Sequence, residues 1–131
     1  MIRQLTLDLP VRTAFGRDDF FVSPGNATAL AALDDWRGWP LGKMLLCGPS
    51  GAGKTHLAHV WAAETDATIL PATDLAASDI ATLATGPVVV EDAEAVAGDP
   101  PAEAALFHLH NALAEARHPL LLTSARPPRD W

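Results

Sequence analysis

The sequence predicts an α/β domain in which helices flank a parallel β-sheet. Short apolar runs alternate with helical patterns along its 131 residues, an order that is typical of parallel α/β proteins. A glycine-rich segment, "GPSGAGK", lies between one apolar run and one helical pattern. With 49% hydrophobic and 19% charged residues, the composition is that of a globular protein, and the length corresponds to one domain.

The first third of the chain predicts an arm, a helix and a strand. Residues 1–25 are expected to form an extended arm, and a helix is expected from about Asn26. The segment "RGWPLG" ends that helix, because glycine and proline disrupt helices. The apolar run 43–47 then predicts a buried strand.

The remaining elements continue the same alternation. Proline and glycine mark their boundaries, as at Gly86-Pro87 and at Pro100-Pro101, where a proline pair suits the first turn of a helix. We expect helices at Lys54 to Thr65, Thr73 to Leu83 and Pro100 to about Arg117, and strands at 67–70, 88–90 and 119–124.

The glycine-rich segment matches the pattern G-x-x-x-x-G-K-[ST], from Gly48 to Thr55, in full. In that pattern, backbone N–H groups and the start of the following helix hold phosphate oxygens, Lys54 reaches the β and γ oxygens, and the Thr55 hydroxyl coordinates Mg²⁺. A glycine turn that binds nothing would explain the glycines but not Lys54 beside Thr55. The predicted nucleotide-binding residues are Pro49, Ser50, Gly51, Ala52, Gly53, Lys54, Thr55 and His56.

An acidic pair, Glu91 and Asp92, directly follows the apolar run Val88 to Val90. The carboxyl ends of parallel strands are where such sheets bind ligands. We therefore predict that Glu91 helps Thr55 to hold Mg²⁺, and that the pair acts in catalysis by orienting the attacking water. A solvated loop is the alternative. The order Glu then Asp differs from the Asp-first order more often found in P-loop ATPases.

Composition excludes several other classes of protein. The net charge of −7 and the pI near 5.0 argue against strong direct DNA binding, which needs clustered basic residues. The apolar runs are too short to span a membrane, and the N-terminus lacks a signal-peptide core. A single cysteine, Cys47, cannot form an internal disulfide, so we expect a cytoplasmic location. The tryptophans Trp36, Trp39 and Trp61 are expected in packing roles.

Three segments carry a resemblance to a known family: "GPSGAGKTHLAHVWA", "VVVEDAEAVAG" and "LLLTSARPPRDW". They resemble the AAA+ module of the bacterial replication initiator DnaA, most closely its short relatives of the Hda type. The likeness runs from about Phe20, so it implies an AAA+ core over 20–131 behind an arm over 1–19. It also places Thr123 and Ser124 in the sensor 1 region, where Ala125 replaces the polar residue usual in the family.

The same resemblance implies an incomplete AAA+ core. The last strand, the arginine finger, sensor 2 and the helical lid of the family would all lie beyond Trp131. The implied strand order is 43–47, 119–124, 88–90, 67–70, which leaves the strand 43–47 at an uncovered edge. The chain is then either a fragment or a natural short form whose edge is covered in some other way.

The arm contains "QLTLDLP", which resembles the short peptide by which Hda and other replication proteins bind the DNA sliding clamp. Gln4 offers an amide, and Leu5, Leu7 and Leu9 suit apolar pockets in an extended peptide. An edge strand with ordinary period-two alternation explains the same residues. Both interpretations remain open at this stage.

The resemblance implies a regulator of replication initiation rather than a dedicated enzyme. Such a protein would bind ATP or ADP with Mg²⁺, act with the sliding clamp on DnaA near the nucleoid and replisome, and show at most weak ATPase activity. Self-association into a homo-oligomer is compatible with this picture. The alternatives are a DnaA fragment, a DnaC-like helicase loader, and an independent P-loop NTPase, although a kinase would need a substrate lid that the sequence does not contain.

Overall fold

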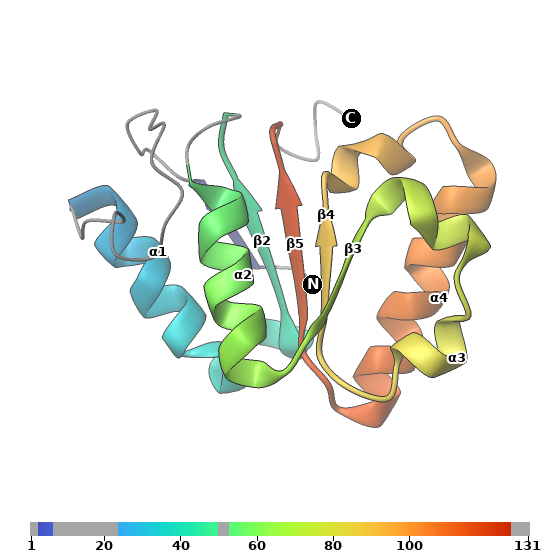
Figure 1. The fold of residues 1–131 in the computed structure, drawn as a ribbon, viewed down its shortest axis with the longest axis horizontal. Coiled ribbons are helices and arrows are strands. Elements are labelled where there is room, and N and C mark those ends of the chain that lie inside the picture. Colours follow the sequence, from blue (N-terminus) through green and yellow to red (C-terminus); the bar gives the residue numbers. More distant parts are fainter. Residues whose placement is uncertain (1–2, 7–23, 50–52, 127–131) are drawn as a thin grey trace.

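The computed structural model describes residues 3–6, 24–49 and 53–126 of the chain. They form a five-stranded sheet in the order β1-β2-β5-β4-β3, and every neighbouring pair is parallel (Figure 1). The strands are β1 (Arg3–Thr6), β2 (Lys43–Cys47), β3 (Thr68–Pro71), β4 (Val88–Glu91) and β5 (Leu120–Ser124).

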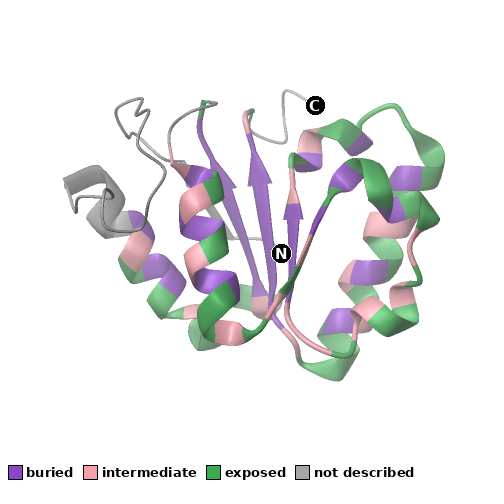
Figure 2. Ribbon diagram, viewed as in Figure 1, coloured by how far each residue is buried: buried purple, intermediate pink, exposed green. Residues whose placement is uncertain are grey.

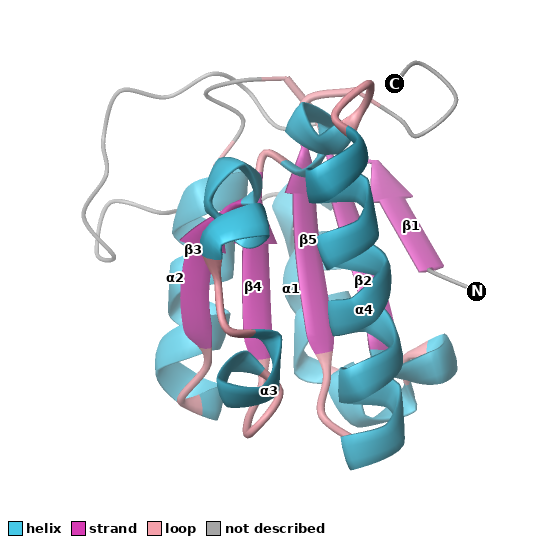
Figure 3. Ribbon diagram, turned by 90° about the vertical axis from the view of Figure 1, so that its right-hand side faces the viewer, coloured by secondary structure: helices cyan, strands magenta, loops and turns pink. Residues whose placement is uncertain are grey.

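Helices cover both faces of this sheet. Helices α1 and α2 lie on one face, and α3 and α4 lie on the other (Figures 1 and 3). Within the described residues, no helix combines the length and apolar character needed to cross a membrane. The α-helices are α1 (Pro24–Asp34), α2 (Lys54–Thr65), α3 (Ile80–Leu83) and α4 (Pro100–Ala116); the 3₁₀ helices are η2 (Trp36–Gly38), η3 (Pro40–Gly42), η4 (Ala72–Ala77) and η5 (Ala93–Val96).

Two apolar cores result from the alternation of side chains along the buried strands. Val89 and Leu121 face the core beneath α1 and α2, whereas Val90 and Leu122 face the core beneath α4, as the period of two in a strand requires. The central strands are buried along their whole length (Figure 2). This burial on both faces explains why their sequences are continuous apolar runs.

The three tryptophans pack together where α2 meets the turns after α1. The Trp39 and Trp61 rings stack with centroids 5.4 Å apart, and the Trp36 ring meets Trp61 edge-on at 6.4 Å. The indole Nε1 of Trp39 donates a hydrogen bond to the Ala32 carbonyl at 2.7 Å. Their predicted packing role is confirmed.

Most predicted elements are present, and the expected order of the four strands from β2 to β3 is confirmed. The single helix expected over Thr73–Leu83 is wrong, because η4 and the one-turn α3 replace it. The break has a local cause. The Asp79 carboxylate accepts hydrogen bonds from the Thr82 N–H at 3.4 Å and from the Thr82 hydroxyl at 2.8 Å, which starts a new helix rather than continuing the old one.

The edge of the sheet also differs from the expectation. The strand 43–47 was expected at an edge, but β1 pairs with it in parallel, from Arg3 opposite Met44 to Thr6 opposite Cys47. Strand β2 is therefore an inner strand, and its backbone groups have partners on both sides.

Candidate functional site

The loop predicted to bind phosphate begins after β2, beside the end of β5. The N–H of Gly48 donates to the Ser124 carbonyl at 3.0 Å, which fixes the first loop residue against the neighbouring strand. Gly53 has φ 92°, a left-handed conformation that glycine adopts without strain, and α2 starts at the next residue. Residues 50–52 lie outside the described part of the chain. The described first residues of the loop thus lie at the carboxyl end of two inner strands, where parallel sheets bind ligands.

Lys54, the first residue of α2, is folded back over this loop. Its side chain is buried, and its Nζ donates to the carbonyls of Gly48 and Pro49, the second bond measuring 2.9 Å. Burial lowers the pKa of Lys54, while the charges of Glu94, Asp92 and Cys47 act in the opposite direction. A buried cation is thereby held against the backbone of the loop, with two acidic side chains near enough to influence it.

The first turn of α2 presents Thr55 and His56. Thr55 is exposed and His56 is half-buried. The first N–H groups of a helix have no partners within the helix and carry its positive dipole end. Thr55, the predicted Mg²⁺ ligand, therefore lies in the first turn of α2, next to these N–H groups.

Glu91 lies at the end of β4 and faces α2. Its Oε1 is 3.5 Å from Nε2 of His59, and His59 follows Thr55 by four residues, so both residues share one face of α2. The carboxylate of Glu91 therefore borders the same helix face as the Thr55 hydroxyl. These two residues were predicted as the metal ligands, and the fold brings their elements together.

The chemistry of this pair suits Mg²⁺. Glu91 Oε1 is buried and has no hydrogen-bond partner among the described residues, and a hydroxyl and a carboxylate are the oxygen donors that Mg²⁺ prefers. The described residues contain no group of three His, Cys, Asp or Glu side chains that could hold a metal. Mg²⁺ is usually bound by one or two protein groups together with substrate phosphates and water.

Asp92 follows Glu91 and turns the chain away from the strand. It is exposed and has φ 56° and ψ 49°, a left-handed conformation that aspartate tolerates better than most residues. Its backbone N–H donates to the Thr123 hydroxyl at 3.1 Å. The buried Thr123 thereby links the end of β5 to the acidic segment after β4.

Ser124, the second residue predicted for the sensor 1 region, is buried and bonds to the backbone beyond the strand. Its hydroxyl donates to the Arg126 carbonyl and accepts from the Arg126 N–H at 3.2 Å. Both sensor 1 hydroxyls are thus engaged by nearby backbone groups.

One acidic residue at this end of the sheet was missed by the sequence reasoning. Glu94, in η5, accepts a hydrogen bond from the Ala125 N–H at 3.4 Å, and among the charges that act on Lys54 its effect is the largest. The only signal of Glu94 in the sequence is its position two residues after Asp92. That position suggests a third acidic side chain near the end of β4.

The predicted clamp-binding residues divide between described and undescribed segments. Gln4 and Leu5 lie in β1, opposite Leu45 and Leu46 of β2, which is the edge-strand arrangement that the alternation also allowed. Leu7 and Leu9 lie outside the described residues.

Comparison with solved structures identifies the fold. The chain is similar to AMPPCP-bound DnaA from Aquifex aeolicus, with a TM-score of 0.74 and 18% identity over 92% of this chain and 44% of that one. It is also similar to DnaA bound to AMPPCP and single-stranded DNA, with a TM-score of 0.67 and 20% identity over 91% of this chain and 44% of that one. No family model matches the chain.

A third match concerns a single domain. Domain III of Thermotoga maritima DnaA aligns with a TM-score of 0.64 and 19% identity, over 92% of this chain and 60% of that one. The chain spans less than half of the two longer DnaA chains. With a parallel sheet and helices on both of its faces, this protein shares the α/β fold of these DnaA structures.

Proposed function

We propose that this protein binds an adenine nucleotide with Mg²⁺ at the Gly48–Thr55 loop. The observation that carries the proposal is Lys54, a buried cation whose hydrogen bonds in the described structure go to Gly48 and Pro49 of the loop itself. A phosphate group at this position would give the amine an anionic partner and would meet the N–H groups at the start of α2.

Each neighbouring residue has a defined role in this proposal. Lys54 would bind the β and γ oxygens, and Thr55 with Glu91 would hold Mg²⁺, which would neutralise the charge of the phosphates. Asp92 would orient a water molecule toward the terminal phosphate. Thr123 would fix the position of Asp92 through the hydrogen bond to its N–H.

The choice of adenine and the biological role follow from resemblance. Two DnaA structures of similar fold are bound to AMPPCP, and the "GPSGAGKTHLAHVWA" segment resembles the DnaA phosphate loop. We therefore propose that residues 20–131 form an AAA+ nucleotide-binding core that acts in replication initiation.

A finer proposal concerns regulation. The "QLTLDLP" motif supports an Hda-like role, in which the protein joins the sliding clamp and promotes hydrolysis of ATP bound to DnaA. Because Gln4 and Leu5 pair with β2, this role requires β1 to leave the sheet edge when the clamp binds. An independent NTPase remains the competing function, and sustained phosphate release by the isolated protein would favour it.

Thermal unfolding with nucleotide tests the central proposal. ADP or ATP with Mg²⁺ at ~100 times its dissociation constant should add roughly 2.7 kcal/mol to the free energy of unfolding, and Lys54→Ala should lose most of that gain. Lys43→Met is the matched control and should keep the stabilisation by nucleotide, because Lys43 is also buried but lies at the opposite end of β2. An unchanged melting curve of the parent protein in millimolar nucleotide, with its circular dichroism spectrum intact, would refute the proposal.

A further inference from the structure

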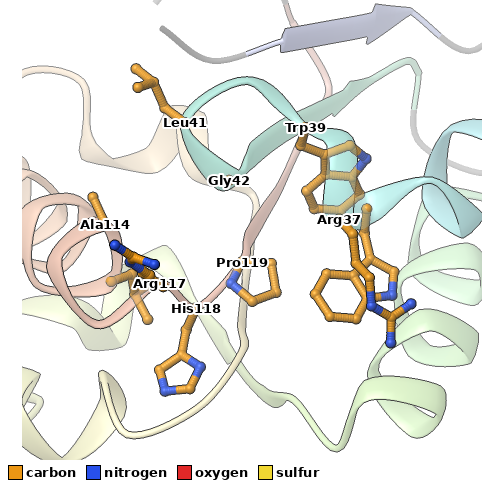
Figure 4. Close-up of a pocket in the computed structure, with 10 residues that line it drawn as sticks. Arg37, Trp39, Leu41, Gly42, Ala114, Arg117, His118 and Pro119 are labelled. Carbon is orange, nitrogen blue, oxygen red and sulfur yellow. The ribbon is translucent and has the colours of Figure 1, made fainter.

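A cavity lies at the end of the sheet opposite the phosphate loop. Its volume is about 280 Å³, and it is lined by Gly42 and Pro119, the residues that precede the first residues of β2 and β5 (Figure 4). The proposed phosphate loop follows the last residue of β2, and its Gly48 is hydrogen-bonded to Ser124, the last residue of β5. The cavity is therefore separate from the proposed nucleotide site.

The lining of this cavity is apolar and basic. Trp36, Trp39 and Pro119 contribute apolar surface, and Arg37 and Arg117 contribute positive charge. The Arg37 guanidinium lies 4.3 Å from the centroid of the Trp36 ring. Figure 4 shows Arg37 and Arg117 on opposite sides of the cavity, with Gly42 and Pro119 between them.

The charge of the lining is opposite to the charge of the protein. The chain carries a net charge of −7 with only nine lysines and arginines, yet two of these, Arg37 and Arg117, line the cavity together with His118, and no lining residue is acidic. The acidic protein thus concentrates positive charge at one apolar cavity, which suits a negatively charged ligand.

Backbone conformation gives an independent sign that two of these side chains matter. The non-glycine residues with positive φ in the described segments are Leu41, Asp66, Asp92 and Arg117. Aspartate adopts this conformation comparatively often, whereas a bulky residue there is unusual. The two unusual residues, Leu41 and Arg117, both line the cavity, and the Leu41 side chain is 61% exposed.

Glycine adopts a positive φ without strain. The backbone conformation alone therefore does not explain why leucine stands at position 41 and arginine at position 117. Retaining leucine and arginine there costs conformational energy. Such local strain is found preferentially where a side chain takes part in binding.

We propose that this cavity is a docking site for a short acidic peptide segment of a partner protein. One apolar side chain of the peptide enters between the tryptophans and Pro119, Leu41 covers it, and carboxylates on either side pair with Arg37 and Arg117. Tryptophan and arginine are the residues that most often dominate binding energy at protein interfaces. The cavity falls just below the size usual for small-molecule sites, roughly 300–1,000 Å³, but it accommodates a single side chain.

The test uses fluorescein-labelled peptides of the form Asp-Glu-Z-Glu-Asp, in which Z is Leu, Phe, Met or Trp. Fluorescence anisotropy with the full chain measures their affinity, and Asn-Gln-Z-Gln-Asn peptides serve as neutral counterparts. At least one acidic peptide should bind, at least about tenfold more tightly than its neutral counterpart, and high salt should weaken it.

Two variants separate binding from folding. Arg117→Gly and Leu41→Gly place glycine where φ is already positive, so both should fold at least as stably as the parent protein. Each should weaken peptide binding about tenfold. Asp66→Gly is the matched control, because Asp66 caps α2 in the same backbone conformation but does not line the cavity; it should bind the peptide at least as well as the parent.

Three results would overturn the proposal. The first is that none of the acidic peptides binds, or that the neutral peptides bind equally well. The second is that Arg117→Gly and Leu41→Gly bind like the parent protein. The third is that sedimentation shows the parent self-associating and Leu41→Gly monomeric, since the cavity would then be an interface between copies of this chain.

Discussion

The buried hydroxyl of Thr123 accepts a hydrogen bond from the backbone N–H of Asp92 at 3.1 Å. This hydrogen bond joins the carboxyl end of β5 to Asp92, the residue after β4. Asp92 directly follows Glu91, the proposed metal ligand. The geometry of the acidic segment therefore depends on a side chain from the neighbouring strand.

Replacing Thr123 by valine keeps the shape of the side chain and removes this hydrogen bond. The free energy of unfolding should fall by about 1–2 kcal/mol, because the Asp92 N–H loses its partner. Chemical denaturation measures the change. Thr123→Ser retains the hydroxyl and should recover part of the loss; if serine and valine behave alike, the hydrogen bond contributes nothing.

Glu91→Gln tests the proposed Mg²⁺ site. The buried Oε1 has no hydrogen-bond partner among the described residues, and its ion-pair contact is with the exposed His59 at 3.5 Å, so the amide should change the stability of the free protein little. It should instead reduce the difference between nucleotide affinity in Mg²⁺ and in EDTA by about tenfold or more, because a carboxylate is lost from the metal site. Isothermal titration under both conditions checks this, and an unchanged difference would exclude Glu91 as a ligand.

Lys43→Met tests the cost of burying a lysine at the start of β2. Lys43 is 1% exposed, its Nζ donates to the Leu41 carbonyl at 2.9 Å, and burial lowers its pKa. The unfolded chain then binds more protons than the folded one between this lowered pKa and about 10.4, so stability should rise with pH across that window.

Methionine at position 43 should remove this rise and stabilise the protein below that window. Urea denaturation at several alkaline pH values measures the slope. The pKa of His110, which is lowered by burial and by the charge of Lys43, should increase in the variant, as an NMR titration would show. If the free energy of unfolding still rises with pH in Lys43→Met, a group other than Lys43 causes the rise.

Clamp binding is predicted to compete with the β1–β2 pairing. Replacing Gln4 and Leu5 by alanine should weaken binding to purified sliding clamp by more than tenfold, since such anchors carry ~2 kcal/mol. Nucleotide affinity should not change. Clamp should also speed hydrogen exchange at Met44 to Cys47, because these residues lose β1 as a partner; equal binding by parent and variant would leave β1 as a structural strand alone.

The inner strands were predictable because their signals are local, and the prediction of a phosphate loop rests on a signal of the same kind. Val88 to Val90 and Leu120 to Leu122 are unbroken apolar runs, and the Gly48–Thr55 pattern contains its own glycines and lysine. These features predict burial and phosphate binding without reference to distant residues, and the burial of the strands is confirmed.

Other features depend on distant contacts and were not predictable. The alternation in "RQLT" is compatible with a strand but does not identify β2 as its partner. The effect of Glu94 on Lys54 arises only when η5 and α2 meet at the same end of the sheet. The left-handed conformations of Leu41 and Arg117 contradict local preference, so no pattern of residue types predicts the cavity they line.

The pairing of β1 with β2 also has a consequence for folding. Arg3 and Met44 are register partners, so this contact closes a loop of roughly 40 residues, whereas helical contacts form within one turn. Strand β1 lies at the end of the sheet, so the edge of β2 that it covers can accept the same four-residue segment from any copy of the chain. At high protein concentration during refolding, β1 is therefore the element that two molecules would exchange, which would give a strand-swapped dimer whose formation depends on concentration.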